Sequence, residues 1–73
     1  MLKLGIYEHY KGKKYEVLGV ARHSETLEQL VVYKALYDST EFGLNAMWAR
    51  PSSLFIETIE IDGQVIPRFK KVA

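Results

Sequence analysis

Cysteine is absent from this 73-residue chain. Its absence excludes disulfides, thiolate zinc sites and cysteine nucleophiles together. We expect a single compact domain over residues 1–73. A domain of this size buries only about 60% of the surface that its unfolded chain exposes, so its stability is modest without further support. Because disulfides are excluded, homo-oligomerisation is the support that we expect on grounds of size.

Strong net charge and long apolar runs are absent as well. The formal net charge is +1, which is too small for the electrostatic footprint of a nucleic-acid-binding protein. No stretch approaches 18 apolar residues, and the N-terminus, which carries Glu8 and His9, is too polar for a signal peptide. We therefore expect a cytoplasmic, soluble protein with no membrane contact.

The spacing of the five glycines forms neither G-x-G-x-x-G nor G-x-x-x-x-G-K, the loops that cradle phosphates. No G-x-S-x-G nucleophile elbow occurs either. We therefore expect no cofactor and assign no catalytic residue. What the chain does contain is 48% hydrophobic residues and 12% aromatic residues, which indicate a folded core rather than disorder.

A period of two in the side-chain pattern predicts strands over residues 4–10 and 15–23. They are joined by the polar stretch Lys11–Lys14, which suits a hairpin or bulge. Gly19 permits a bend or bulge in the second strand. Strict alternation would place one set of its side chains on a single face, namely Tyr15, Val17, Gly19, Ala21 and His23.

Two interpretations stay open for residues 27–37. Thr26-x-x-Gln29 matches a helix capping box, and the apolar residues that follow have roughly helical spacing. Their branched and aromatic side chains favour a strand instead, and we adopt the strand over residues 29–37. The loop before it contains no glycine or proline, so its turn depends on Ser, Thr and Glu side chains that bond nearby backbone groups.

The second half of the chain predicts further short strands, separated by a polar loop over residues 38–46 and a single 3₁₀ turn near Pro51–Leu54. Asp62-Gly63 is a strong hairpin signal, and Pro67 makes the last strand an edge strand or an irregular one. Five or six short strands with brief turns favour a mainly β fold, a small antiparallel barrel or sandwich. The predicted strands of this half span residues 46–50, 56–61 and 64–69.

Several strings follow one another in order: Tyr7-x-His9-Tyr10-Lys11-Gly12, Tyr15-x-Val17, Ala21-x-His23-Ser24-Glu25-Thr26, Val31-Val32-Tyr33, Leu36-Tyr37, Trp48-x-Arg50-Pro51, Phe55-x-Glu57 and Pro67-Arg68-Phe69. In combination they resemble a small bacterial family known as domain of unknown function 1653. The resemblance extends from Gly5 to Phe69 and departs at Ala49, where the family often has valine. It implies a compact, mainly β domain of SH3-like barrel type, and it implies no established activity.

Side chains with binding chemistry are spread over several predicted strands and loops. Tyrosine and tryptophan rings are amphipathic, and arginine holds planar or anionic groups by stacking and paired hydrogen bonds. The alternative is that these rings simply fill the core. Because neighbours on a strand point to opposite faces, alternation pairs His23 with Glu25 and separates it from Ser24. The candidate binding residues are Tyr7, His9, Tyr10, His23, Glu25, Tyr33, Trp48, Arg50 and Arg68.

His9, His23 and Glu25 are side chains that zinc accepts. The sequence places no third strong ligand beside His23 and Glu25, and hydrogen bonds to loop backbone are the better explanation for these two. We therefore predict no metal site.

Three functional hypotheses remain. The one that we favour is a non-enzymatic binding module that recognises a protein or peptide through the aromatic and polar surface, with weak nucleic-acid binding as a variant. The second is a small-ligand or catalytic site at a homo-oligomer interface, formed by His9, His23, Glu25 and Arg50. The third is a structural or regulatory accessory domain without a discrete site. Convergence of the candidate residues on one surface would favour a site, whereas scattering would leave them folding roles.

Overall fold

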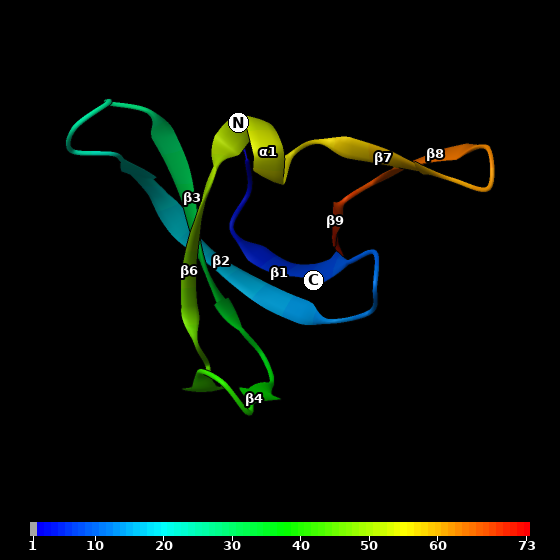
Figure 1. The fold of residues 1–73 in the computed structure, drawn as a ribbon, viewed down its shortest axis with the longest axis horizontal. Helices are drawn as coiled ribbons and strands as arrows, with labels where there is room; N and C mark the ends of the chain where they lie inside the picture. Colours follow the sequence, from blue (N-terminus) through cyan, green and yellow to red (C-terminus); the bar gives the residue numbers. More distant parts are fainter. Residues whose placement is uncertain (1) are drawn as a thin grey trace.

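The computed structural model describes residues 2–73. A curved, five-stranded antiparallel sheet forms the body, in the order β6-β3-β2-β1-β9 (Figure 1). The hairpins β4–β5 and β7–β8 form two small separate ladders. The strands are β1 Gly5–His9, β2 Lys14–Arg22, β3 Gln29–Ala35, β4 Asp38–Ser39, β5 Gly43–Leu44, β6 Met47–Pro51, β7 Thr58–Ile61, β8 Gln64–Pro67 and β9 Phe69–Lys71.

This architecture confirms the predicted mainly β, antiparallel class. The predicted helical turn is present as one turn of α-helix, α1, over Ser52–Phe55. In the part of the chain that the structure describes, β6 pairs only with β3 and β9 only with β1, so the sheet stays open and does not close into a barrel. No helix within residues 2–73 is long and apolar enough to span a bilayer.

A bulge in β2 changes which side chains share a face. The register of β2 on β3 shifts between Val17 and Gly19, so Leu18 is an extra residue in this strand. The bend or bulge expected at Gly19 is therefore confirmed. Beyond it, Val20 lies opposite the buried Val31. The single predicted face of the strand is wrong past the bulge, because one extra residue moves the following side chains to the other side of the sheet.

The loop between β2 and β3 closes a long hairpin, so the strand interpretation is confirmed and the helix is wrong. The His23 N–H donates to the Glu28 carbonyl oxygen at 2.7 Å, and Leu27 adopts a positive φ of 62°. The Nδ1 atom of His23 accepts the backbone N–H groups of Glu25 and Thr26 at 3.1 and 3.3 Å. His23 and Glu25 lie beyond the end of β2, so strand alternation does not place them on one face.

The β7–β8 hairpin projects from the sheet (Figure 1). Its turn confirms the Asp62-Gly63 signal, because both residues have positive φ, 51° and 80°, as a type I′ turn requires. The irregular end expected at Pro67 is also confirmed, since β8 stops there and β9 starts two residues later. Arg68 occupies the break.

The core is mostly aromatic and lies against one face of the sheet. The Phe55 ring, carried by α1, stacks parallel to the Phe69 ring with centroids 4.2 Å apart. The rings of Tyr7 and Tyr33 meet Phe55 edge-on at 5.6 and 5.3 Å. Because each aromatic side chain buries a large area, a few rings give this short chain its core. The buried hydrophobic residues are Tyr7, Val17, Val31, Tyr33, Ala35, Phe55 and Phe69.

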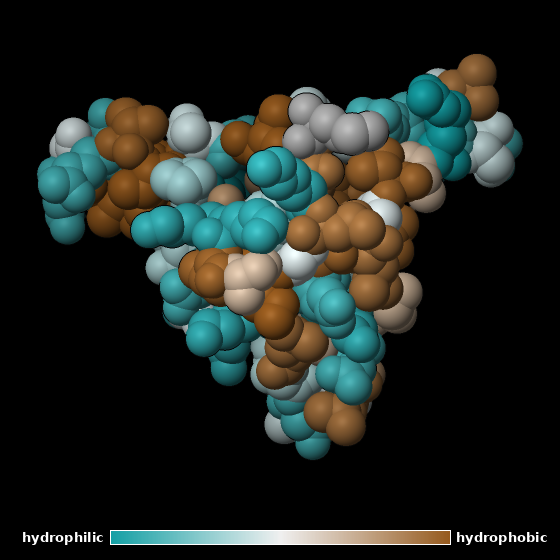
Figure 2. Space-filling model, turned by 180° about the vertical axis from the view of Figure 1, so that it is seen from behind, coloured by the Kyte–Doolittle hydropathy of each residue, from teal (hydrophilic) through white to brown (hydrophobic). Residues whose placement is uncertain are grey.

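Hydrophobic side chains also remain on the surface. In the view of Figure 2 they are interspersed with hydrophilic ones over the body and the projecting arms. Exposed examples are Ile61 and Val65 on the β7–β8 hairpin and Leu44 on β5. On this face of the molecule, exposed hydrophobic side chains alternate with polar ones.

Replacing Phe55 with alanine is expected to lower the free energy of unfolding by about 3–5 kcal/mol, because the side chain is 1% exposed and stacks on Phe69. Urea unfolding followed by circular dichroism measures the change. The control is Phe42→Ala, since Phe42 is 60% exposed and its removal should cost less than about 1 kcal/mol. Equal losses for the two variants would contradict this assignment of the core.

Candidate functional site

Three candidate residues distant in the sequence come together around Phe69. The imidazole of His9 meets the Phe69 ring edge-on at 4.9 Å, and the guanidinium carbon of Arg50 lies 5.7 Å from the same ring. Arg68 directly precedes Phe69 in the chain, and its guanidinium carbon lies 6.0 Å from the centre of the Tyr10 ring. We call the surface formed by His9, Tyr10, Arg50 and Arg68 the basic patch.

Sheet pairing explains why these residues meet. β1 and β9 are neighbours, and their register sets His9 directly opposite Phe69. Arg50 comes from β6 at the other edge of the sheet, where it lies opposite the buried Val31. Arg68 sits in the break between β8 and β9. The patch therefore depends on the curvature that brings both edges of the sheet around one aromatic cluster.

His9 is held as a neutral ring that can donate one hydrogen bond. Its Nδ1 atom accepts the backbone N–H of Lys11 at 3.2 Å, which leaves the ring proton on Nε2. Burial lowers the pKa of His9, and the positive charges of Arg68, Arg50 and Lys11 lower that pKa further. At neutral pH the imidazole adds a polar donor to the patch without adding charge.

Arg68 is fixed by the chain around it. Its Nη2 atom donates to Oε1 of Glu57 at 2.7 Å. Its backbone N–H donates to the Glu57 carbonyl oxygen at 3.0 Å, and its own carbonyl oxygen accepts the N–H of Tyr10 at 3.0 Å. Its buried Nε atom has no hydrogen-bond partner within the described residues. Glu57 thus offsets the charge of Arg68, while one donor is left unused.

Arg50 differs from Arg68 because nothing nearby neutralises it. Its side chain is half-buried, yet within residues 2–73 it makes no ion pair and no side-chain hydrogen bond. It lines a hollow of about 180 Å³ together with Tyr15, Tyr33 and Trp48. A partly desolvated guanidinium without a partner gains from any anion that reaches it, so this hollow is suited to a negatively charged group.

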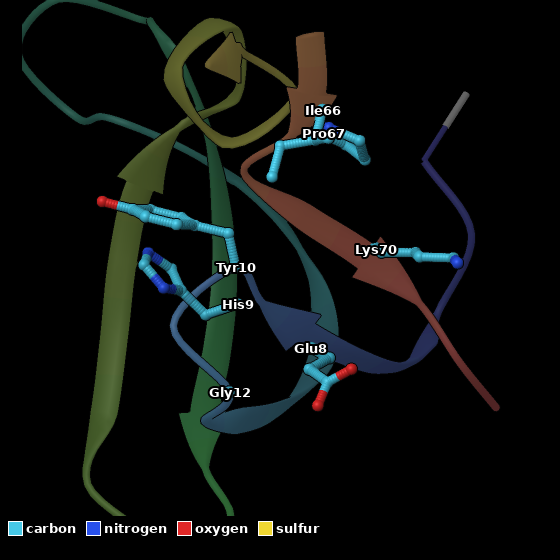
Figure 3. A pocket seen from close by; sticks show the side chains of 7 residues that line it. All are labelled: Glu8, His9, Tyr10, Gly12, Ile66, Pro67 and Lys70. Carbon is cyan, nitrogen blue, oxygen red and sulfur yellow. The ribbon is translucent and has the colours of Figure 1, made fainter. Parts of the chain in front are cut away.

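A second hollow, of about 430 Å³, adjoins the other side of the patch (Figure 3). In Figure 3 the rings of His9 and Tyr10 lie at the left, and Ile66 and Pro67 lie at the top. Glu8 lies below the centre of the view, and Lys70 lies at the right. Glu8 and Lys70 are directly opposed on β1 and β9. Charges of both signs line this hollow, so it favours anions less than the hollow beside Arg50 does.

Tyr15 belongs to the site although it is not among the predicted binding residues. Its hydroxyl shares a 2.7 Å hydrogen bond with the hydroxyl of Tyr37. Burial raises the pKa of Tyr15, and this hydrogen bond raises that pKa further. The sequence did carry a signal, because Tyr15 opens the alternating pattern of its strand. The bonded pair holds one wall of the Arg50 hollow in place.

The remaining candidates fall into two groups. Tyr7 and Tyr33 are buried, at 6% and 5% exposure, and Tyr7 donates its hydroxyl proton to the Lys3 carbonyl oxygen at 2.6 Å. Tyr33 also borders the hollow beside Arg50. His23 and Glu25 lie in the β2–β3 loop, separated from His9 by the nine residues of β2, or roughly 30 Å along the strand. Within one chain, they therefore lie far from His9.

Metal-ligating side chains are scattered in the same way. Among residues 2–73, no three histidine, aspartate or glutamate side chains gather closely enough to hold a metal ion. His9 and His23 lie near opposite ends of β2. In each imidazole, the Nδ1 atom already accepts a hydrogen bond from a backbone N–H group.

Residues 5–71 match the family described as Protein of unknown function (DUF1653). The chain belongs to this family. It is also similar to the crystal structure of a DUF1653 protein from Bordetella bronchiseptica, at 41% identity and a TM-score of 0.87, over 97% of this chain and 87% of that one. No curated protein matches the chain. The resemblance of the sequence strings to this family is thus confirmed.

The lowered pKa of His9 predicts how stability changes with pH. In the unfolded chain His9 has its ordinary pKa of about 6.5, so between that value and its lower pKa in the folded protein the unfolded state binds more protons. The free energy of unfolding should therefore fall as the pH drops through this window. Chemical unfolding of the wild type and of His9→Gln from pH 7.5 to 5 should show a steeper fall in the wild type. Parallel curves would contradict the assigned environment of His9.

Proposed function

We propose that this domain is a non-enzymatic binding module that holds a negatively charged side chain of a protein or peptide partner at the basic patch. The observation that carries the proposal is Arg50, a half-buried arginine with no anionic partner among the described residues, beside a hollow with aromatic walls. A carboxylate there would satisfy the guanidinium bidentately.

The surroundings support an acidic group on a larger partner rather than a free anion. Trp48 is 37% exposed and Tyr10 is 36% exposed, so each ring is partly accessible to a partner. Tyrosine and tryptophan contribute strongly to protein interfaces because their rings are rigid and amphipathic. The proposed ligand therefore combines a carboxylate with an apolar or aromatic neighbour.

We also propose a likeness to SH3-like barrels, whose aromatic surfaces bind extended peptides; the curved sheet with rings on one face suits this use. The proposed location is the cytoplasm, because a chain without cysteine needs no oxidising environment to fold.

The two other hypotheses have less support. Nucleic acid would need several unneutralised cations, whereas Glu57 pairs with Arg68 and the net charge is only +1. A catalytic site from His9, His23, Glu25 and Arg50 would need two chains, because the loop that holds His23 and Glu25 is far from His9 within one chain.

Selection from a random dodecapeptide display library tests the proposal. Peptides enriched on the wild-type domain should contain aspartate or glutamate next to an apolar residue, and Arg50→Gln should bind them at least about tenfold more weakly, because a charge-assisted hydrogen bond is lost. Arg50→Lys should fall between the two, since it keeps the charge and loses the paired geometry.

The matched control for this experiment is Lys3→Gln, which removes one positive charge from an exposed residue outside the basic patch. It should change affinity by less than about twofold, because solvent and salt screen an exposed charge that does not contact the ligand. Selected peptides that lack acidic residues, or equal binding by the wild type and Arg50→Gln, would overturn the proposal. Tight, salt-sensitive binding of short oligonucleotides would favour nucleic acid instead.

A further inference from the structure

β6 exposes a strand edge directly beside the hollow that contains Arg50. In residues 2–73, β6 pairs with β3 on one side only. The Ala35 N–H donates to the Ala46 carbonyl oxygen at 2.8 Å. This bond shows which residues of β6 direct their backbone groups toward β3. Because antiparallel bonds alternate, the backbones of Trp48 and Arg50 face β3. Those of Met47, Ala49 and Pro51 face outward.

The sequence of β6 agrees with an open edge of limited length. Pro51 has no N–H group, and its position faces outward, which is the side of an edge strand where proline is tolerated. The outward groups are then the N–H and carbonyl of Met47 and of Ala49, and the carbonyl of Pro51. An added strand has room for bonds to three successive outward positions.

The same edge carries the side chains that would select the strand. Arg50 and Trp48 lie opposite the buried residues Val31 and Tyr33, so both side chains are on the face that holds the aromatic cluster. In an antiparallel addition, the residues opposite Arg50 and Trp48 would share this face and lie two positions apart.

We propose that the partner is an extended acidic segment that adds to β6 as an antiparallel strand. Its aspartate or glutamate lies opposite Arg50, and an aromatic or large apolar residue two positions later lies opposite Trp48. This inference rests on the proposed function and adds to it the mode of binding, main-chain pairing at a sheet edge. It also fixes the order of the motif, with the acidic residue first.

A second copy of this chain is the other occupant of such an edge. Pairing of two β6 strands, each with the sequence MWARP, would bring no carboxylate to either Arg50. Each Arg50 would therefore remain without an anion in such a pair. The unmatched guanidinium therefore favours an acidic partner segment over self-association.

A capped synthetic heptapeptide, TVETYVT, tests the inference when each backbone nitrogen in turn is methylated. Methylation of the first valine, the threonine between glutamate and tyrosine, or the second valine removes an N–H aimed at β6. Each should weaken binding about tenfold, as measured by fluorescence polarisation. Methylation of the glutamate or tyrosine nitrogen, which faces away, should change affinity by less than about twofold.

The outcomes of this series separate failure of acidic recognition from failure of strand addition. If TVETYVT binds no better than TVQTYVT, acidic recognition fails and strand addition fails with it. If glutamate is preferred but methylation shows no alternation, only strand addition is overturned, and capture by side chains alone stands. Sedimentation that shows a dimer, converted to monomer by Ala49→Pro, would place a second copy on the edge and overturn the inference.

Discussion

The parallel stack of Phe55 on Phe69 is the contact on which the rest of the molecule depends. It joins α1, which follows β6, to β9, which pairs with β1, with ring centroids 4.2 Å apart. The two strands involved are opposite edges of the sheet. A chain of this length has few residues with which to build a core, so rings that each bury a large area replace many aliphatic side chains.

The same stack creates the surface that we consider functional. Phe69 contacts His9 on one side and Arg50 on another, so the charged groups rest on the outer part of the buried ring cluster. Glu57 neutralises Arg68, whereas Arg50 has no such partner among the described residues. The fold therefore leaves one partly desolvated positive charge at an open strand edge. A partner segment can supply both the missing carboxylate and the missing ladder bonds.

Local chemistry made much of this fold predictable. Alternation, the Asp62-Gly63 turn and the prolines identified the strands and their ends, because these signals act over a few residues. The bulge at Leu18 could only be anticipated from Gly19, and its reversal of the strand face could not, since register is decided by pairing with β3. His23 illustrates the same limit, because its nitrogen bonds the loop backbone rather than joining a strand face.

The site was less predictable because it is built from long-range contacts. His9, Arg50 and Arg68 were identified as candidate residues by type, yet their convergence depends on β1 pairing with β9 and on the curvature of the sheet. Chemical-shift mapping of the ¹⁵N-labelled domain with the selected acidic peptide tests the central claim most directly. We expect the largest shifts at Arg50 and Ala49, at the Trp48 indole and at His9. Shifts confined to the β2–β3 loop or the β7–β8 hairpin would contradict it.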